Sequence, residues 1–314
     1  MAEQVQAAIV AEKLTKSFPG VRAVDHLSFD VRSGEIFGLV GPDGAGKTTT
    51  LRMLAGIMPP DKGKATVAGS DVVRDPEGAK HHLSYMPQRF GLYEDLTVDE
   101  NIRFYADLFG VRKAERDERG AQLLRAAGMS EFRARLAGKL SGGMKQKLGL
   151  VCALIHRPKV ILLDEPTTGV DPVSRRDFWR ILYELISQGV TILTSTAYLD
   201  EAERCHRVAL LHQGKLLFCD TPANLKQKLG KTVLSITSSE PRLLRNTLEH
   251  AEGISSLVLT GDGIHLVVDS AGRIPEFEAR LKNAGVAFEA IRQVTPTIED
   301  LFVDAVSSGA SHEA

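Results

Sequence analysis

The chain has 314 residues and a formal net charge of −1, with 43% hydrophobic and 25% charged residues. This composition is typical of a soluble globular protein of one or two domains. The near-zero charge argues against a global attraction to nucleic acid or anionic lipid, and no apolar run approaches the ~18 residues of a membrane span. Acids early in the chain do not fit a secretory signal, and the three cysteines have irregular spacings that predict reduced, buried thiols.

The first part of the chain has the pattern of an α/β domain. Alternating or continuous apolar residues predict strands at residues 8–18, 24–31, 36–40, 63–72, 160–165, 190–195 and 207–220. The continuous runs predict strands that are buried on both faces, as in a parallel sheet. Long helical patterns replace strand patterns in the middle of this part. We therefore expect one domain over residues 1–228, with a helical subdomain at about 88–155.

The remaining chain has a different pattern and predicts a second, smaller α+β domain at residues 229–306. A strand, a helix, a hairpin, a second helix and a final strand follow one another, which is the β-α-β-β-α-β order of a ferredoxin-like fold. Pro296 and Thr297 are expected to start a closing helix. The small and polar residues 307–314 are expected to form a disordered tail.

A phosphate-binding loop is predicted at residues 41–48, which match the pattern G-x-x-x-x-G-K-[ST]. The match follows an apolar strand and opens a helix, so backbone N–H groups and the helix N-terminus can face a phosphate. Lys47 is expected to reach the β- and γ-phosphates, and Thr48 to place its hydroxyl on Mg²⁺. The predicted nucleotide-binding residues of this loop are Gly41, Pro42, Asp43, Gly44, Ala45, Gly46, Lys47, Thr48 and Thr49.

Two acids follow the apolar strand at residues 160–163. Asp164, at the end of this strand, can hold Mg²⁺ through water. Glu165 can orient and polarise a water for in-line attack on the γ-phosphate. Taken alone, the pair would read as solvated acids at a strand end, but beside a phosphate loop it predicts ATP hydrolysis.

A second anion site is predicted where Ser141, Gly142 and Gly143 start a helix, because a hydroxyl and exposed N–H groups meet there. A helix start that binds nothing is the alternative. Together with the phosphate loop and the acidic strand, the stretch LSGGMKQKLGL at residues 140–150 resembles the signature motif of the ATP-binding cassette (ABC) ATPases. The resemblance covers about residues 8–228 and implies a P-loop ABC cassette: a RecA-like core, an antiparallel β subdomain and a helical subdomain.

The resemblance implies that two cassettes enclose ATP, with residues 141–143 facing the γ-phosphate bound by the other subunit. Phe18 matches the aromatic residue that stacks on adenine, although a lone Phe can also be a core residue. Gln88 matches the glutamine that joins Mg²⁺ to the interface with a membrane partner. Asp171 matches the loop residue that contacts the opposite cassette.

Residues 89–101, which include the aromatic residues Phe90 and Tyr93, would receive a helix of a membrane permease. The stretch PTIEDLFV at residues 296–303 is similar to the end of bacterial daunorubicin-resistance ATPases, and the cassette motifs resemble a multidrug or ion exporter subgroup. This resemblance implies ATP and Mg²⁺ as cofactors. It also implies a multi-span permease and a second cassette as partners, no nucleic acid, and a peripheral place on the cytoplasmic face of the membrane. It does not identify the cargo.

One position departs from the family pattern. The strand at residues 190–195 should lead to a histidine that contacts the γ-phosphate, but Ala197 occupies that position. His206 is expected to lie too far along the next helix to replace it. A missing donor to the transferring phosphoryl group commonly lowers the rate by about 10²–10³. We expect tight ATP binding and slow hydrolysis at this site, unless Ser195, Thr196 or Tyr198 supplies a hydroxyl.

Two other functions fit parts of the sequence. A soluble ABC ATPase that acts on ribosomes or DNA usually has twin cassettes or a long coiled coil, and this chain shows neither pattern. A regulatory subunit that binds ATP without turning it over would explain Ala197, although Glu165 argues against it.

Overall fold

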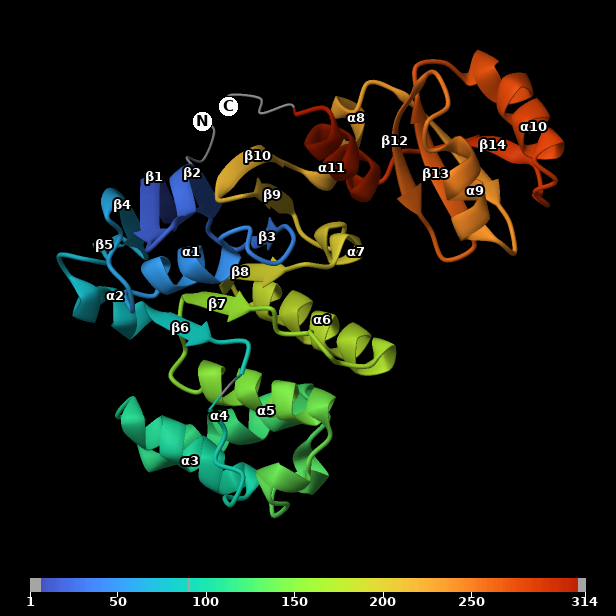
Figure 1. The fold of residues 1–314 in the computed structure, drawn as a ribbon. Helices are drawn as coiled ribbons and strands as arrows, with labels where there is room; N and C mark the ends of the chain where they lie inside the picture. The colour runs from blue at the N-terminus through green and yellow to red at the C-terminus, as the bar shows by residue number, and fades with distance from the viewer. Residues whose placement is uncertain (1–6, 90, 310–314) are drawn as a thin grey trace, which may run out of the picture. The chain divides into compact units, whose positions relative to one another are not determined.

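The computed structural model describes residues 7–89 and 91–309, so Phe90 and the last five residues of the expected tail lie outside the described residues. The chain divides into two compact units (Figure 1). One runs to Tyr198 and includes Cys205–Leu216, and the other comprises Leu199–Arg204 and the chain from Leu217 onward. The boundary at residue 228 stays a prediction. Within the described chain, no helix combines the length and apolarity needed to cross a membrane.

An antiparallel sheet opens the first unit, with its strands in the order β2-β1-β4-β5. The strands are β1 (Ala7–Phe18), β2 (Val21–Arg32), β4 (Lys62–Val67) and β5 (Ser70–Asp71). Alternating buried and exposed side chains on β2 show why its sequence alternates, because only one face packs inward.

The second sheet of this unit has the order β10-β9-β3-β8-β7-β6. Its strands are β3 (Ile36–Val40), β6 (Leu83–Met86), β7 (Val160–Asp164), β8 (Thr191–Thr196), β9 (Arg207–His212) and β10 (Lys215–Asp220). Strand β3 pairs in parallel with β8 and β9, and β7 pairs in parallel with β6 and β8. Every residue of β3, β7 and β8 is buried. Because these strands are parallel, the chain segments that follow them meet at one edge of the sheet.

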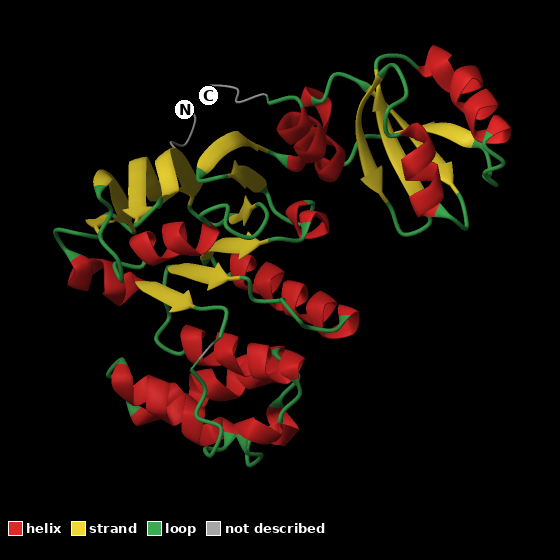
Figure 2. Cartoon of the chain, in the orientation of Figure 1, coloured by secondary structure: helices red, strands yellow, loops and turns green. Residues whose placement is uncertain are grey.

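Helices complete the first unit, and those between β6 and β7 form the helical stretch seen in Figure 2. The helices are α1 (Lys47–Leu54), α2 (Pro76–His82), α3 (Val98–Leu108), α4 (Lys113–Ala126), α5 (Gly142–Leu154) and α6 (Pro172–Ser187). Thr97 caps α3 with a reciprocal capping box to Glu100. The side chain of Asn101 is fully buried, and it accepts the N–H of Tyr93 at 2.9 Å, which ties the preceding loop to α3.

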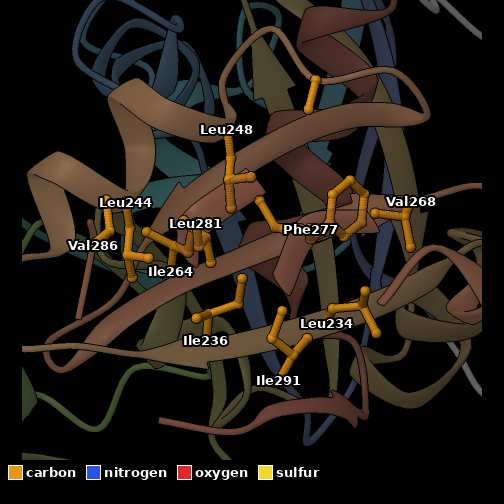
Figure 3. Close-up of a cluster of buried hydrophobic side chains, with 12 residues drawn as sticks. Leu234, Ile236, Leu244, Leu248, Ile264, Val268, Phe277, Leu281, Val286 and Ile291 are labelled. Atoms are coloured by element: carbon orange, nitrogen blue, oxygen red, sulfur yellow. The ribbon is translucent and has the colours of Figure 1, made fainter. Parts of the chain in front are cut away.

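The second unit contains a four-stranded antiparallel sheet in the order β12-β13-β11-β14. Its elements are α7 (Leu199–Ala202), α8 (Pro222–Lys228), β11 (Thr232–Thr237), α9 (Pro241–Leu248), β12 (Ile254–Leu259), β13 (Gly263–Val268), α10 (Ile274–Asn283), β14 (Ile291–Val294) and α11 (Ile298–Ser307). Leu244 and Leu248 of α9, with Phe277 and Leu281 of α10, cover one face of the sheet in a buried cluster (Figure 3). This cluster gives the second unit its own hydrophobic core.

Candidate active site

The loop between β3 and α1 turns sharply at two glycines. Gly44 and Gly46 have φ values of 78° and 98°, which residues other than glycine rarely adopt. A Cβ atom on Gly46 would lie 2.3 Å from the carbonyl oxygen of Ala23, and one on Gly41 would lie 2.3 Å from that of Leu211. At Gly41 and Gly46 the loop therefore packs so closely against backbone from β9 and β2 that neither residue can carry a side chain.

Backbone hydrogen bonds hold the two ends of this loop. The N–H of Gly41 donates to the carbonyl of Thr196 at 3.3 Å, and the N–H of Gly214 donates to the carbonyl of Ala45 at 3.2 Å. Residues far apart in the sequence therefore fix the loop at the carboxyl edge of the parallel sheet.

The ammonium group of Lys47 is buried beneath the loop, with its side chain only 4% exposed. It donates to the carbonyls of Gly41 at 2.7 Å and Pro42 at 3.1 Å, and it lies 3.1 Å from a carboxylate oxygen of Glu165. A positive charge thus stands at the base of the loop, next to the acid that the sequence predicts to activate water.

Three hydroxyl groups surround the Asp164 carboxylate at the end of β7. Thr48 and Ser195 donate to Oδ1 at 3.0 and 2.8 Å, and Tyr85 donates to Oδ2 at 3.1 Å. Burial and the neighbouring Asp164 charge raise the pKa of Tyr85 to about 12, so its hydroxyl stays a donor at neutral pH. The structure brings Thr48 and Asp164 together as the sequence leads one to expect for a shared cation.

Glu165 is held in a left-handed conformation with φ 48°. Its N–H donates to the hydroxyl of Ser195 at 3.0 Å. Its carboxylate accepts hydrogen bonds from Gln88 at 3.2 Å and Thr168 at 3.3 Å, in addition to the contact with Lys47. Strained backbone of this kind persists only where the surroundings fix it. Several independent contacts therefore fix the orientation of the Glu165 carboxylate.

Lys47, Gln88 and Glu165 line one cavity of about 470 Å³, which is large enough for a small-molecule ligand. Phe18 borders it with a side chain that is 42% exposed, so this aromatic ring is available for contact with a ligand. The lining residues are Phe18, Val21, Ala23, Asp43, Gly44, Ala45, Gly46, Lys47, Thr48, Thr49, Gln88 and Glu165.

The stretch Ser141–Gly143 lies at the start of α5 and is not among the residues that line this cavity. Ser141 caps the helix, and its hydroxyl accepts an N–H of the first turn at 3.3 Å. Gly142 is open on its surface, whereas a Cβ atom on Gly143 would lie 2.5 Å from the Cβ of Ser174. Ser141 and Gly142 are thus exposed at the start of α5, whereas Gly143 is buried against Ser174.

Asp171 caps α6 and does not line the cavity either. Its carboxylate accepts the N–H groups of Val173 and Ser174 at 3.1 and 2.9 Å. Hydrogen bonds from the side chain and the backbone of Ser174 lower the pKa of Asp171. The carboxylate therefore stays ionised at the surface.

Ala197 is exposed just after the end of β8, at the carboxyl edge of the sheet. Three residues that carry hydroxyl groups, Ser195, Thr196 and Tyr198, flank this position. Ser195 is already bonded to Asp164 and to the N–H of Glu165. Thr196 is buried, and its hydroxyl accepts the N–H of Tyr198 at 3.0 Å.

The Tyr198 ring lies under the guanidinium group of Arg175, 4.3 Å from it. The expectation that His206 lies along the helix after β8 is wrong, because α7 ends at Ala202 and His206 immediately precedes β9. Its Nδ1 accepts the N–H of Ile36 at 3.0 Å, at the amino end of β3 and thus at the opposite edge of the sheet.

Sequence reasoning missed two groups at this site. Tyr85 hydrogen-bonds Asp164 and Thr168 hydrogen-bonds Glu165, although neither residue was assigned a role from the sequence. The available signal was weak: Tyr85 lies near the carboxyl end of a strand that leads to Gln88, and Thr168 lies three residues after Glu165.

Comparison with known proteins agrees with this geometry. The family described as "ABC transporter" matches residues 24–168. The daunorubicin/doxorubicin resistance ATP-binding protein DrrA of Streptomyces peucetius is 39% identical over 75% of this chain and 72% of its own length. The chain therefore belongs to the ABC transporter family, in the group of ATP-binding proteins, which confirms the resemblance drawn from its motifs.

A longer relative matches nearly the whole chain. The probable multidrug ABC transporter ATP-binding protein YbhF of Escherichia coli is 44% identical over 98% of this chain, but the chain spans only 54% of that protein. A solved ATP-binding subunit of an ABC transporter is 31% identical with a TM-score of 0.65, covering 71% of this chain and 93% of its own. The cassette fold expected for the first part of the chain is thus confirmed.

Proposed function

We propose that this chain binds and hydrolyses ATP to drive a bacterial exporter through a separate membrane permease. The observation that carries the proposal is the single cavity in which Phe18, the phosphate loop, Gln88 and Glu165 meet. The relatives support the transport class, because their names describe multidrug and daunorubicin resistance. They do not favour the alternative of a soluble ATPase acting on ribosomes or nucleic acid. Efflux of a drug, another small molecule or an ion is the corresponding cargo class.

In this proposal the N–H groups of the loop and the Lys47 ammonium bind the phosphates of ATP. Phosphate oxygens would compete with Glu165 for Lys47, which now lies 3.1 Å from that carboxylate. Glu165 would then accept a proton from the attacking water, while Gln88 and Thr168 keep its carboxylate oriented. Phe18 would stack on the adenine ring.

The residues near the phosphate loop fit Mg²⁺. A hydroxyl, a carboxylate and a side-chain amide supply the hard oxygen donors that this ion prefers, and Thr48 and Asp164 already lie 3.0 Å apart. Thr48, Asp164 and Gln88 would hold the ion, which when bound neutralises charge on the β- and γ-phosphates.

We also propose that the chain works as one of two cassettes. The support is that Ser141, Gly142 and Asp171 are exposed at helix starts and do not line the cavity of their own chain, so they can serve a second cassette. The working complex would sit on the cytoplasmic face of the membrane, beside the permease. Residues 229–306 would form a ferredoxin-like regulatory domain, which the β-α-β-β-α-β order and the strand order β12-β13-β11-β14 support.

The site would bind ATP well and hydrolyse it slowly, because Ala197 replaces a donor to the γ-phosphate. Ser195 already donates its hydroxyl proton to Asp164, and Thr196 is buried, which supports this reading. A regulatory subunit that binds ATP without any hydrolysis is the second alternative. Ala197 alone favours it, and the fixed orientation of the Glu165 carboxylate argues against it.

The test is to purify the full chain and measure ATP binding and steady-state hydrolysis, with Lys47→Ala as the binding-deficient control. We expect binding that depends on Lys47, a slow but measurable rate, and stimulation of that rate when a multi-span partner protein is co-expressed and copurified. Absence of ATP binding would contradict the proposal. Copurification with ribosomes in place of a membrane protein would favour the alternative function.

A further inference from the structure

Asp164 receives three hydroxyl hydrogen bonds, and only that from Thr48 comes from the phosphate loop. We infer that Tyr85 and Ser195 are positioning residues that fix the Asp164 carboxylate and so set how strongly Mg²⁺ supports nucleotide binding. This inference rests on the proposed function, and it assigns positioning roles to two side chains that the sequence alone did not link to Asp164.

The geometry constrains both oxygens of the carboxylate. Ser195 donates to Oδ1 at 2.8 Å, from the strand on one side of β7, and Tyr85 donates to Oδ2 at 3.1 Å, from the strand on the other side. The terminal torsion of an aspartate is intrinsically broad. Because donors on both flanking strands each hold one oxygen, the plane of the Asp164 carboxylate cannot rotate without breaking a charge-assisted hydrogen bond.

The hydrogen bonds to Asp164 are shielded from water. Ser195 is fully buried, Asp164 is 1% exposed, and Tyr85 is partly buried, so water competes little for these bonds.

Ser195 has a second task that Tyr85 lacks. Its hydroxyl accepts the N–H of Glu165 at 3.0 Å while it donates to Asp164. It therefore joins the acid that would hold the cation to the acid that would activate water. Loss of the Tyr85 hydroxyl should alter the Mg²⁺ dependence, whereas loss of the Ser195 hydroxyl should alter both the Mg²⁺ dependence and kcat.

The experiment uses the full chain and the fluorescent analogue trinitrophenyl-ATP, titrated in EDTA and at a series of Mg²⁺ concentrations. Partners of a metal ligand commonly change metal affinity by 10–100-fold. For Tyr85→Phe we expect unchanged affinity in EDTA and a rise of about 10-fold in the Mg²⁺ concentration that gives half-maximal enhancement of binding. Ser195→Ala should show the same shift, together with a lower kcat.

Tyr105→Phe is the matched control. The hydroxyl of Tyr105 donates to the carbonyl of Gly91 at 2.8 Å, and burial raises its pKa to about 12, as for Tyr85. It does not line the ATP cavity, so its removal should leave the Mg²⁺ dependence unchanged. Thermal unfolding of each variant shows whether it is folded.

Unchanged Mg²⁺ dependence in both Tyr85→Phe and Ser195→Ala would overturn the inference. Equal loss of binding in EDTA and in Mg²⁺ would also overturn it, because these residues would then shape the site without acting through Asp164. Failure of the wild type to bind the analogue would contradict the proposed function itself, and the inference about Tyr85 and Ser195 would fail with it.

Discussion

The ammonium group of Lys47 lies 3.1 Å from the carboxylate of Glu165, so the charge that would bind phosphate and the group that would activate water are in direct contact. Both side chains are shielded, with 4% and 12% exposure. Removing the charge of either side chain should therefore affect the other. We expect Lys47→Ala to impair ATP binding and Glu165→Gln to impair hydrolysis.

For Glu165→Gln we expect hydrolysis to fall by about 10²–10⁴, the usual contribution of a general base, while ATP affinity is kept or increased. Affinity can rise because Lys47 loses an ionic competitor for the phosphates. Equilibrium binding and single-turnover hydrolysis on the same preparation separate these effects. A variant that hydrolyses at the wild-type rate would remove Glu165 from the mechanism.

For Ala197→His we expect turnover to increase, by up to about 10²-fold, because a donor to the transferring phosphoryl group is added. Binding should change little, since Ala197 is exposed and does not line the nucleotide cavity. Tyr198→His serves as the control with histidine one residue further on. Robust wild-type hydrolysis that histidine at position 197 does not improve would contradict the assignment of a degenerate site.

Gly46→Ala should abolish measurable nucleotide binding. An alanine at φ 98° costs about 1–3 kcal/mol in strain, and its Cβ atom would press on the carbonyl of Ala23 at 2.3 Å. Gly44→Ala is the milder comparison, because it has a positive φ but nothing within 4 Å of the added atom. Isothermal titration should rank affinity as wild type above Gly44→Ala above Gly46→Ala, and the reverse order of the two variants would refute the packing argument.

The loop, the acid pair and the cassette were predictable from sequence because each depends on local order: strand, glycine turn, helix. Tyr85 was not, since its hydrogen bond to Asp164 spans 79 residues and depends on which strands become neighbours. His206 was misplaced for a related reason. Helix α7 ends at Ala202, and Cys205 packs against Gly38 of β3, where an added Cβ atom would lie 2.9 Å from the cysteine sulfur. This contact joins residues far apart in the sequence, so the local pattern around His206 does not reveal it.

In the second unit, His265 contacts the buried Asp300 at 3.2 Å. The hydrogen bond to Asp300, opposed by burial, raises the pKa of His265. Burial works against ionisation of Asp300, but hydrogen bonds from His265 and Thr297 outweigh it and lower the pKa of Asp300. The raised histidine pKa adds stability that is complete below its unfolded value, about 6.5, and is lost as pH rises through the folded pKa. The lowered aspartate pKa adds stability that is lost at acid pH, as pH falls below about 3.8.

We therefore expect the second unit to be most stable between about pH 4 and 6.5, and to lose stability as the pH rises above this window. His265→Gln should flatten the loss on the alkaline side. Thermal unfolding across pH measures both effects, with His250→Gln as the control because no ion pair of His250 is seen among residues 7–89 and 91–309. An equal slope in wild type and His265→Gln would contradict the assignment.

Truncating one buried aromatic side chain should strongly destabilise the second unit. Phe277 is fully buried among the cluster in Figure 3, so Phe277→Ala should lower the free energy of unfolding of this unit by about 3–5 kcal/mol. The exposed Leu243→Ala on α9 is the control and should cost far less. Urea denaturation followed by circular dichroism measures both.

Adjacent residues at the end of β8 make different contacts at the site. The Ser195 hydroxyl hydrogen-bonds the Asp164 carboxylate and the N–H of Glu165, and the carbonyl of Thr196 accepts the N–H of Gly41 at the start of the phosphate loop. Ala197 makes neither kind of contact. We therefore expect exchange of the Ala197 side chain to leave the contacts of the two acids and the phosphate loop intact, and to change turnover without changing affinity. In the proposed pair of cassettes, this single position on each chain would set how long bound ATP persists before hydrolysis.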